Sequence, residues 1–148
     1  MPKIITTKFG EVTYNSSDIV TFIKPILGFS DLKKYIVISR PESEPFKWLQ
    51  SVEDPNTCFV IVDPTLICKN YILEISNFDM KQLKGSDNKD EYFIYGIVTI
   101  PKGNPDDMSV NLQGPIVIYS NNLNAVQLIL NNPDYNIHHK VLRSEEMV

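Results

Sequence analysis

The chain has 148 residues, of which 43% are hydrophobic and 22% are charged, and its formal net charge is −4. This length suits one domain that buries its own core, and the composition excludes an intrinsically disordered chain. Basic residues number 14 against 18 acidic ones, and no basic run exceeds Lys33-Lys34, so a basic protein partner is favoured over DNA or RNA.

β-Branched side chains dominate the apolar composition. The sequence holds 18 Ile, 12 Val and 7 Thr but a single alanine, Ala125. β-Branched residues favour strands, whereas alanine is the strongest helix former. The composition therefore predicts a mostly β fold.

The first half of the chain predicts short strands separated by turn residues. A hairpin is expected over residues 3–14, because Gly10 permits the positive φ of a tight turn. Further strands are predicted at Asp18–Ile23, Tyr35–Ile38, Phe46–Ser51 and Phe59–Asp63. Between the first two of these, Ser30–Lys34 is expected to form at most one helical turn.

The second half continues the same pattern and adds the best helix candidate. Strands are predicted at Tyr71–Ile75, Tyr92–Ile100, Ser109–Gln113, Ile116–Tyr119, Ala125–Leu130 and Tyr135–Leu142. Gly96 indicates a bulge or a close backbone contact within its strand. Ser76 to Leu83 is predicted to be a short helix with Ser76 as its cap and Phe78 and Leu83 as its apolar contacts.

About ten short strands without a long helix predict a sandwich or a barrel. No linker divides the chain, so we expect one domain over residues 1–142 and a flexible tail over 143–148. No stretch approaches the roughly 20 apolar residues that span a membrane, and residues 1–10 lack the apolar centre of a signal peptide. With only Cys58 and Cys68, the chain is expected to be cytoplasmic and reduced.

The sequence offers no convergent set of catalytic groups. His138 and His139 are adjacent, so on a strand they point to opposite faces, and we expect one to be half-buried and the other solvated rather than both to bind a metal. The carboxylate pairs Glu53-Asp54, Asp106-Asp107 and Glu145-Glu146 fit solvated loops. We therefore expect no enzyme activity, cofactor or metal site.

Aromatic side chains leave one alternative open. Tyr92, Phe93 and Tyr95 resemble a base-stacking platform, but they alternate inside an apolar strand and are interpreted as core. A nucleic-acid-binding or small-ligand-binding β-barrel therefore remains the alternative to a protein that binds other proteins.

Two motifs carry a family resemblance. They are FKWLQSVEDP at residues 46–55 and NLQGPIVI at 111–118, and the similarity extends to ILGF at 26–29, FVIVDP at 59–64 and GIVTIP at 96–101. Together they resemble the FliW family of flagellar assembly factors over most of the chain. Gly114 departs from the pattern, because alanine is expected there more often.

The resemblance implies a partly open β-barrel of antiparallel strands and a regulator of motility that is not an enzyme. It implies that the protein binds cytoplasmic flagellin in a chaperone-like way. When free of flagellin it would bind and antagonise the RNA-binding translational repressor CsrA, so that flagellin messenger RNA is translated. No direct nucleic-acid, membrane or small-molecule partner is implied.

Most of the motif residues are interpreted as structural. This set comprises Phe46, Trp48, Leu49, Gln50, Pro64, Gly114 and Pro115. Trp48 and Leu49 point to opposite faces of their strand, and Trp48 is expected to be a core anchor, with an exposed binding tryptophan as the alternative.

Five polar residues are the candidates for partner binding, namely Glu53, Asp54, Asp63, Asn111 and Gln113. The three carboxylates lie in Asp-Pro turns flanking one strand and suit a basic repressor, or else they bond their own turn backbone. The amides of Asn111 and Gln113 share one side of a strand, where they either lock an internal network or bond a partner. The flagellin surface is expected to be apolar, with edge strands and the Ile26–Phe29 bend as candidates.

Overall fold

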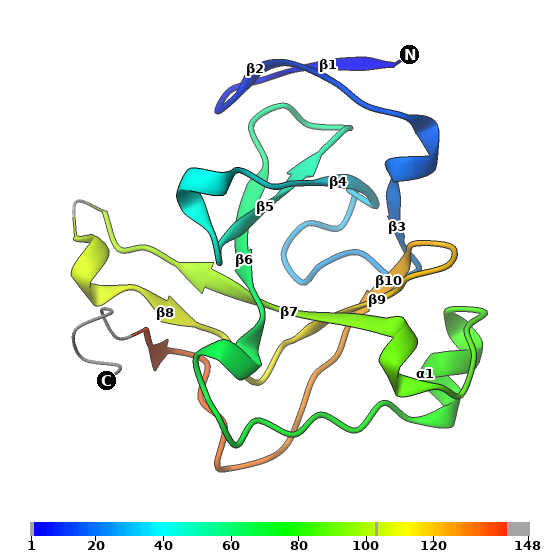
Figure 1. Ribbon diagram of the computed structural model, residues 1–148, viewed down its shortest axis with the longest axis vertical. Coiled ribbons are helices and arrows are strands. Elements are labelled where there is room, and N and C mark those ends of the chain that lie inside the picture. The colour runs from blue at the N-terminus through cyan, green and yellow to red at the C-terminus, as the bar shows by residue number, and fades with distance from the viewer. Residues whose placement is uncertain (1, 103, 142–148) are drawn as a thin grey trace.

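The computed structural model describes residues 2–102 and 104–141, which form eleven strands and one α-helix (Figure 1). The strands are β1 (Lys3–Thr6), β2 (Gly10–Thr13), β3 (Val20–Phe22), β4 (Lys34–Ile38), β5 (Lys47–Ser51), β6 (Cys58–Val62), β7 (Tyr92–Thr99), β8 (Ser109–Val110), β9 (Ile116–Tyr119), β10 (Asn124–Gln127) and β11 (His139–Lys140). The helices are α1 (Asn77–Gln82) and the 3-10 turns η1 (Ser16–Asp18), η2 (Pro41–Ser43), η3 (Pro64–Leu66), η4 (Lys89–Glu91) and η5 (Pro105–Asp107).

Seven of the strands close into a barrel. Their order is β7-β6-β5-β4-β3-β10-β9, and β9 pairs back onto β7. The mostly β class is confirmed, with two refinements. The ring of strands is closed rather than partly open, and β10 pairs with β3 in parallel while the other ladders are antiparallel. Both features join segments far apart in the chain, which local patterning does not specify.

A bulge between β8 and β9 allows this closure. Both strands lie along the same edge of β7, with Val98 opposite Val110 and Tyr95 opposite Ile116. An advance of three residues along β7, from Val98 to Tyr95, therefore corresponds to an advance of six residues, from Val110 to Ile116, along the neighbouring segment. The three extra residues belong to the segment 111–115, which leaves the ladder so that the chain can rejoin β7 in a new register.

The close backbone contact expected at Gly96 lies beside this bulge. A Cβ atom on Gly96 would come within 2.4 Å of Val110 Cγ2. Gly96 thus allows β7 to approach β8 where the neighbouring strand changes register. Any added side chain at this position would force Val110 to move.

Most of the other predicted elements are present, and the predicted strand at Tyr71–Ile75 is wrong. That segment is extended and buries Tyr71 and Ile75, but it belongs to no ladder. The backbone N–H of Ile72 donates instead to Tyr135 Oη at 2.8 Å, and Tyr135 Oη donates to the carbonyl of Ile72. Alternating burial therefore arises here from packing alone, without strand pairing.

The short helix is confirmed, and so is its cap. Ser76 Oγ accepts from the backbone N–H of Asp79 at 3.1 Å. Leu83 is fully buried as expected, but Phe78 is 64% exposed, and Met80 provides the other apolar contact. Ser30 and Asp31 form a turn without a helix, and Lys34 already begins β4. The strands predicted at Ser109–Gln113 and Tyr135–Leu142 shrink to the two-residue strands β8 and β11. Leu142 and the expected tail 143–148 lie outside the described residues.

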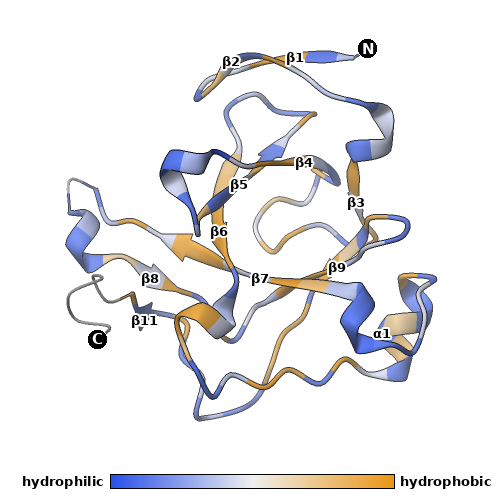
Figure 2. Cartoon of the chain, in the orientation of Figure 1, coloured by the Kyte–Doolittle hydropathy of each residue, from blue (hydrophilic) through white to orange (hydrophobic). Residues whose placement is uncertain are grey.

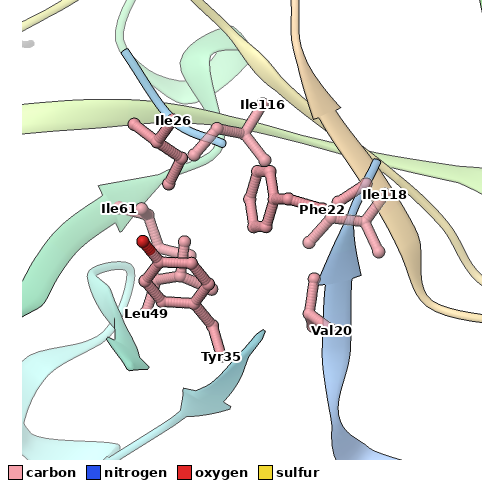
Figure 3. Close-up of a cluster of buried hydrophobic side chains, with 9 residues drawn as sticks. Val20, Phe22, Ile26, Tyr35, Leu49, Ile61, Ile116 and Ile118 are labelled. Carbon is pink, nitrogen blue, oxygen red and sulfur yellow. The ribbon is translucent and has the colours of Figure 1, made fainter. Parts of the chain in front are cut away.

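The main core fills the barrel interior (Figure 3). Its residues are contributed by six of the barrel strands and the 26–29 bend, and they are Val20, Phe22, Ile26, Tyr35, Leu49, Ile61, Ile116, Ile118 and Ala125. Ile26 enters from a loop, which ties the bend to the barrel. Figure 2 shows the matching pattern, with hydrophobic residues along β3, β4 and β7 and hydrophilic ones in the turns.

Two further apolar clusters cover the outside of the barrel. One packs α1 against β9 and β10 through Met80, Leu83 and Val117. The other packs the 67–73 segment against β6, β7 and β8 through Tyr71, Val62 and Val98. In the part of the chain that the structure describes, no helix is long and apolar enough to cross a membrane.

Two buried tyrosines differ in what their hydroxyl groups contact. Tyr71 Oη donates to the carbonyl of Leu112 at 2.7 Å, whereas the buried Tyr35 hydroxyl has no partner among the described residues. Burial raises the pKa of Tyr35 to about 12, with a smaller contribution from the negative charges of Glu53 and Asp54. Apolar packing of its ring, rather than a hydrogen bond from its hydroxyl, therefore holds Tyr35 in the barrel core.

We expect Tyr35→Phe to leave the free energy of unfolding unchanged or to raise it, because the substitution removes an unpartnered polar atom. Tyr71→Phe is the matched control, and it should lower the free energy of unfolding by about 1–2 kcal/mol because a buried carbonyl loses its donor. Urea unfolding of both variants measures the difference. An equal loss in both would show that the Tyr35 hydroxyl has a partner.

Candidate functional site

The turn between β5 and β6 brings two of the predicted carboxylates together. Glu53 is exposed, yet its Oε1 atom accepts from the backbone N–H groups of Lys33 at 2.7 Å and Lys34 at 2.8 Å. These two bonds hold the pKa of the Glu53 carboxyl below its usual value of 4.5. Glu53 therefore joins this turn to the start of β4 and keeps its charge at neutral pH.

Asp54 is held by its own turn. Its carboxylate accepts from the backbone N–H of Asn56 at 3.0 Å and from Thr57 Oγ1 at 2.8 Å. These bonds lower the pKa of the Asp54 carboxyl. The turn thus presents two adjacent negative charges whose positions are set by hydrogen bonds.

Gln50 and Ser51 build the base of this turn. Gln50 is fully buried, and its Nε2 donates to the carbonyls of Ser51, Pro55 and Thr57. Ser51 Oγ accepts from the N–H groups of Glu53 and Asp54. Gln50 and Ser51 of the 46–55 motif are therefore structural. Ser51 and Thr57 were missed as turn residues, although hydroxyls beside an acidic Asp-Pro turn are a recognisable signal.

Asp63 lies at the opposite end of β6 from Glu53 and Asp54. Its Oδ1 atom accepts from Thr65 N at 3.0 Å and from Thr65 Oγ1 at 2.7 Å, so it caps η3. Because β6 separates the two ends, the three carboxylates do not form one continuous face. Asp63 instead borders a groove of about 390 Å³ that Phe93 and Tyr95 also line.

The amides of Asn111 and Gln113 lock the bulge between β8 and β9. Asn111 Oδ1 accepts from the backbone N–H groups of Gln113 at 3.0 Å and Gly114 at 2.9 Å. Gln113 Nε2 donates to the carbonyls of Asn132 at 3.2 Å and Tyr135 at 2.7 Å. The sequence left two alternatives for these amides, an internal network or bonds to a partner protein. The contacts observed form an internal network, and binding of a partner by Asn111 and Gln113 stays a prediction.

Gln127 completes this network and was not predicted. Its Nε2 donates to the carbonyl of Gly114 at 3.1 Å, and its Oε1 accepts from the backbone N–H of Leu27 at 3.1 Å. The sequence feature that could have indicated this role is the position of Gln127 between Val126 and Leu128 in an otherwise apolar strand. Gly114 and Pro115 are both buried at this junction.

Trp48 is not the core anchor that we expected. Leu49 points into the barrel and is fully buried, so Trp48 faces outward, where it is half-buried. The β1–β2 hairpin covers it, with the Phe9 ring edge-on at 5.2 Å between centroids and Lys8 Nζ at 5.5 Å from the indole. Two other residues of the structural set also lie outside the barrel interior. Phe46 is partly buried and packs against the cluster that contains Val62 and Val98, and Pro64 is buried as the first residue of η3.

The remaining candidates show no shared site in the described ranges 2–102 and 104–141. His138 is exposed and His139 half-buried, as expected, and His138 Nδ1 lies 3.3 Å from Ser109 Oγ. No group of three or more possible metal ligands occurs in these ranges. Cys58 and Cys68 are free and half-buried, and burial raises the pKa of the Cys58 thiol.

The three aromatic residues of β7 do not form a platform. Tyr92 is buried and packs against Tyr119 at 5.0 Å between ring centroids. Tyr95 packs against the interior core, while Phe93 is 50% exposed rather than part of the core. The geometry thus defines a small closed β-barrel protein whose outward features are turns, edges and shallow grooves.

Comparison with known proteins identifies the family. A family model described as "FliW protein" matches residues 3–141. A flagellar assembly factor FliW of Thermosipho africanus is 43% identical over 135 residues, covering 91% of this chain and 92% of the relative. One of Thermotoga neapolitana is 38% identical over 144 residues, covering 97% of this chain and 95% of the relative.

Solved structures agree with these relatives. A crystal structure of the flagellar assembly factor FliW superposes with a TM-score of 0.86 at 30% identity, covering 97% of this chain and 99% of that chain. The chain belongs to the FliW family of flagellar assembly factors. The resemblance carried by the motifs at residues 46–55 and 111–118 is thereby confirmed.

We expect Glu53→Gln to lower stability at neutral pH and to flatten its dependence on acid. The folded pKa of Glu53 is depressed, so its stabilising contribution is complete above the ordinary value of 4.5 and is lost as pH falls through the lower folded value. Urea unfolding at pH 7 and pH 3 measures this effect. The exposed Glu42→Gln is the control, and matching pH profiles for both variants would contradict the assignment.

Gly114 and Gly96 should respond differently to an added methyl group. On Gly114 a Cβ meets the amide ends of Asn111 and Gln127, both at 2.9 Å, and these flexible groups can shift. On Gly96 it meets Val110 at 2.4 Å inside the packed ladder. Gly96→Ala should therefore cost about 1–3 kcal/mol and Gly114→Ala less than about 1 kcal/mol in urea unfolding. Equal costs would contradict this.

Proposed function

We propose that this protein couples flagellin supply to flagellin synthesis as a cytoplasmic, non-enzymatic regulator. It binds newly made flagellin in a chaperone-like way. Once flagellin leaves, the free protein binds the translational repressor CsrA and antagonises it, so that flagellin messenger RNA is translated. The observation that carries this proposal is membership of the FliW family along residues 3–141.

The acidic turn between β5 and β6 supports a basic partner such as an RNA-binding repressor. Hydrogen bonds hold Glu53 and Asp54 in their charged forms and in fixed positions. A preordered pair of charges needs little reorganisation on binding and speeds the encounter with an oppositely charged surface. Asp63 lies too far along β6 to share this contact, so its binding role would concern a second surface.

The hydrogen bonds of the candidate carboxylates also support a role without catalysis. Each of Glu53, Asp54 and Asp63 accepts from backbone or threonine donors of nearby turns. These bonds fix the three carboxylates in position, and those to Glu53 and Asp54 lower the pKa of these two carboxyls, whereas a general acid needs a raised pKa. These residues therefore suit recognition of a partner protein.

The test is binding of purified CsrA and of flagellin to the full chain. We expect the wild type to bind each, and added flagellin to release CsrA. The double variant Glu53→Gln and Asp54→Asn keeps hydrogen-bond acceptors but removes two charges. It should slow association with CsrA at low salt about tenfold, with the effect shrinking at high salt.

The exposed Glu42→Gln removes one charge at the opposite end of β5, in η2, and is the control that should leave the association rate within about twofold of the wild-type value. Circular dichroism of the double variant verifies that the barrel is intact. Unchanged CsrA kinetics in a folded double variant would remove the turn from the repressor site. Failure of the wild type to bind either protein would overturn the proposed function.

A further inference from the structure

The chain beyond β10 remains extended and bonds on one side only. The backbone N–H of Leu128 donates to the carbonyl of Pro115 at 2.8 Å, and that of Leu130 donates to Gln113 at 2.8 Å. Both bonds point toward the β9 side. Because backbone groups alternate along a strand, Gln127 and Ile129 direct their N–H and C=O groups to the opposite side.

That opposite side is where β3 pairs with β10 and then leaves it. The last bond of this ladder runs from Ile23 N to the carbonyl of Ala125 at 2.9 Å. Pro25 follows, and the chain then bends so that Ile26 enters the barrel core. Among the described residues, the backbone N–H and C=O of Ile129 have no hydrogen-bond partner. The sheet thus ends in a short open edge at residues 127–130.

A groove with aliphatic and charged walls lies along this edge. It has a volume of about 420 Å³, and Pro25, Leu27, Leu128, Ile129 and Leu130 line it. Leu27 is 77% exposed and Ile129 is 64% exposed, which places two large aliphatic side chains in water at one site. An open backbone edge beside exposed aliphatic side chains is the arrangement that accepts an added strand.

Charged groups stand at the walls of the groove. Glu74 lines it from the segment before α1, Asp79 from the first turn of α1, and Lys24 from the segment after β3. A second groove continues from it, shares Glu74 and Leu130, and adds Asp134. The combined charge of these groups is negative, so the site favours a segment that carries lysine or arginine.

We propose that the edge at residues 127–130 binds an extended segment of flagellin by strand addition. The segment would pair with the backbone of Gln127 and Ile129, place aliphatic side chains beside Leu27 and Ile129, and direct a cationic side chain to Glu74 and Asp79. This inference rests on the proposed function and names the surface that serves it. It places the flagellin contact at an edge strand and at the 26–29 bend.

The test measures flagellin affinity for variants of the full chain. Ile129→Pro deletes an N–H that has no partner in the fold, so the barrel should tolerate it, as edge strands tolerate proline. We expect flagellin binding to weaken about tenfold or more, because a backbone hydrogen bond is lost and the proline ring blocks the edge. Glu74→Lys, which leaves the edge intact, should weaken binding through charge.

Ile5→Ala is the matched control, because Ile5 is 74% exposed on the β1–β2 hairpin. It should leave flagellin affinity unchanged. Hydrogen exchange of the wild type gives a measurement without mutation, and the amides of Gln127 and Ile129 should become protected when flagellin binds. Far-ultraviolet circular dichroism verifies that the Ile129→Pro variant is folded.

The outcomes separate the two proposals. Flagellin binding by the wild type with no protection at 127–130 would overturn the edge proposal and leave the proposed function standing. Equal binding by the wild type, folded Ile129→Pro and Glu74→Lys would do the same. If flagellin does not bind the wild type at all, both proposals fail.

Discussion

The pairing of β7 with both β8 and β9 along one edge is the constraint on which the rest of the structure depends. It closes the barrel only because residues 111–115 leave the ladder and return to it three residues out of register. Asn111 holds that bulge through two backbone N–H groups, and Gln113 ties it to the 132–135 segment. Closure of the barrel through the β7–β9 pairing therefore depends on this bulge.

The two family motifs thus have related structural tasks. The 46–55 motif ends in a turn whose backbone is bonded by Gln50 and Ser51, and the 111–118 motif forms the bulge and the closing strand. In both motifs the amide and hydroxyl side chains, those of Gln50, Ser51, Asn111 and Gln113, form internal hydrogen bonds. The two surfaces that we propose for partners are the carboxylates of the β5–β6 turn, within the first motif, and the backbone edge at residues 127–130, which is open where β3 leaves β10.

Local chemistry made the strands, the Ser76 cap and the Gly96 contact predictable from the sequence. The prediction failed where a neighbour distant in the chain decides the outcome. Tyr71–Ile75 alternates like a strand but finds no ladder, and Trp48 faces outward because Leu49 occupies the interior. The candidate site was predicted in part. Glu53 and Asp54 share one turn, but β6 separates them from Asp63, which spacing along the chain did not reveal.

The contact between the hairpin and the barrel has an optical consequence. Trp48 is the single tryptophan of the chain, and its indole is half-buried under Phe9 and beside Lys8 rather than in the interior. Its fluorescence therefore reports the environment beneath the β1–β2 hairpin. The protein therefore carries an intrinsic fluorescent probe at the contact between its N-terminal hairpin and strand β5.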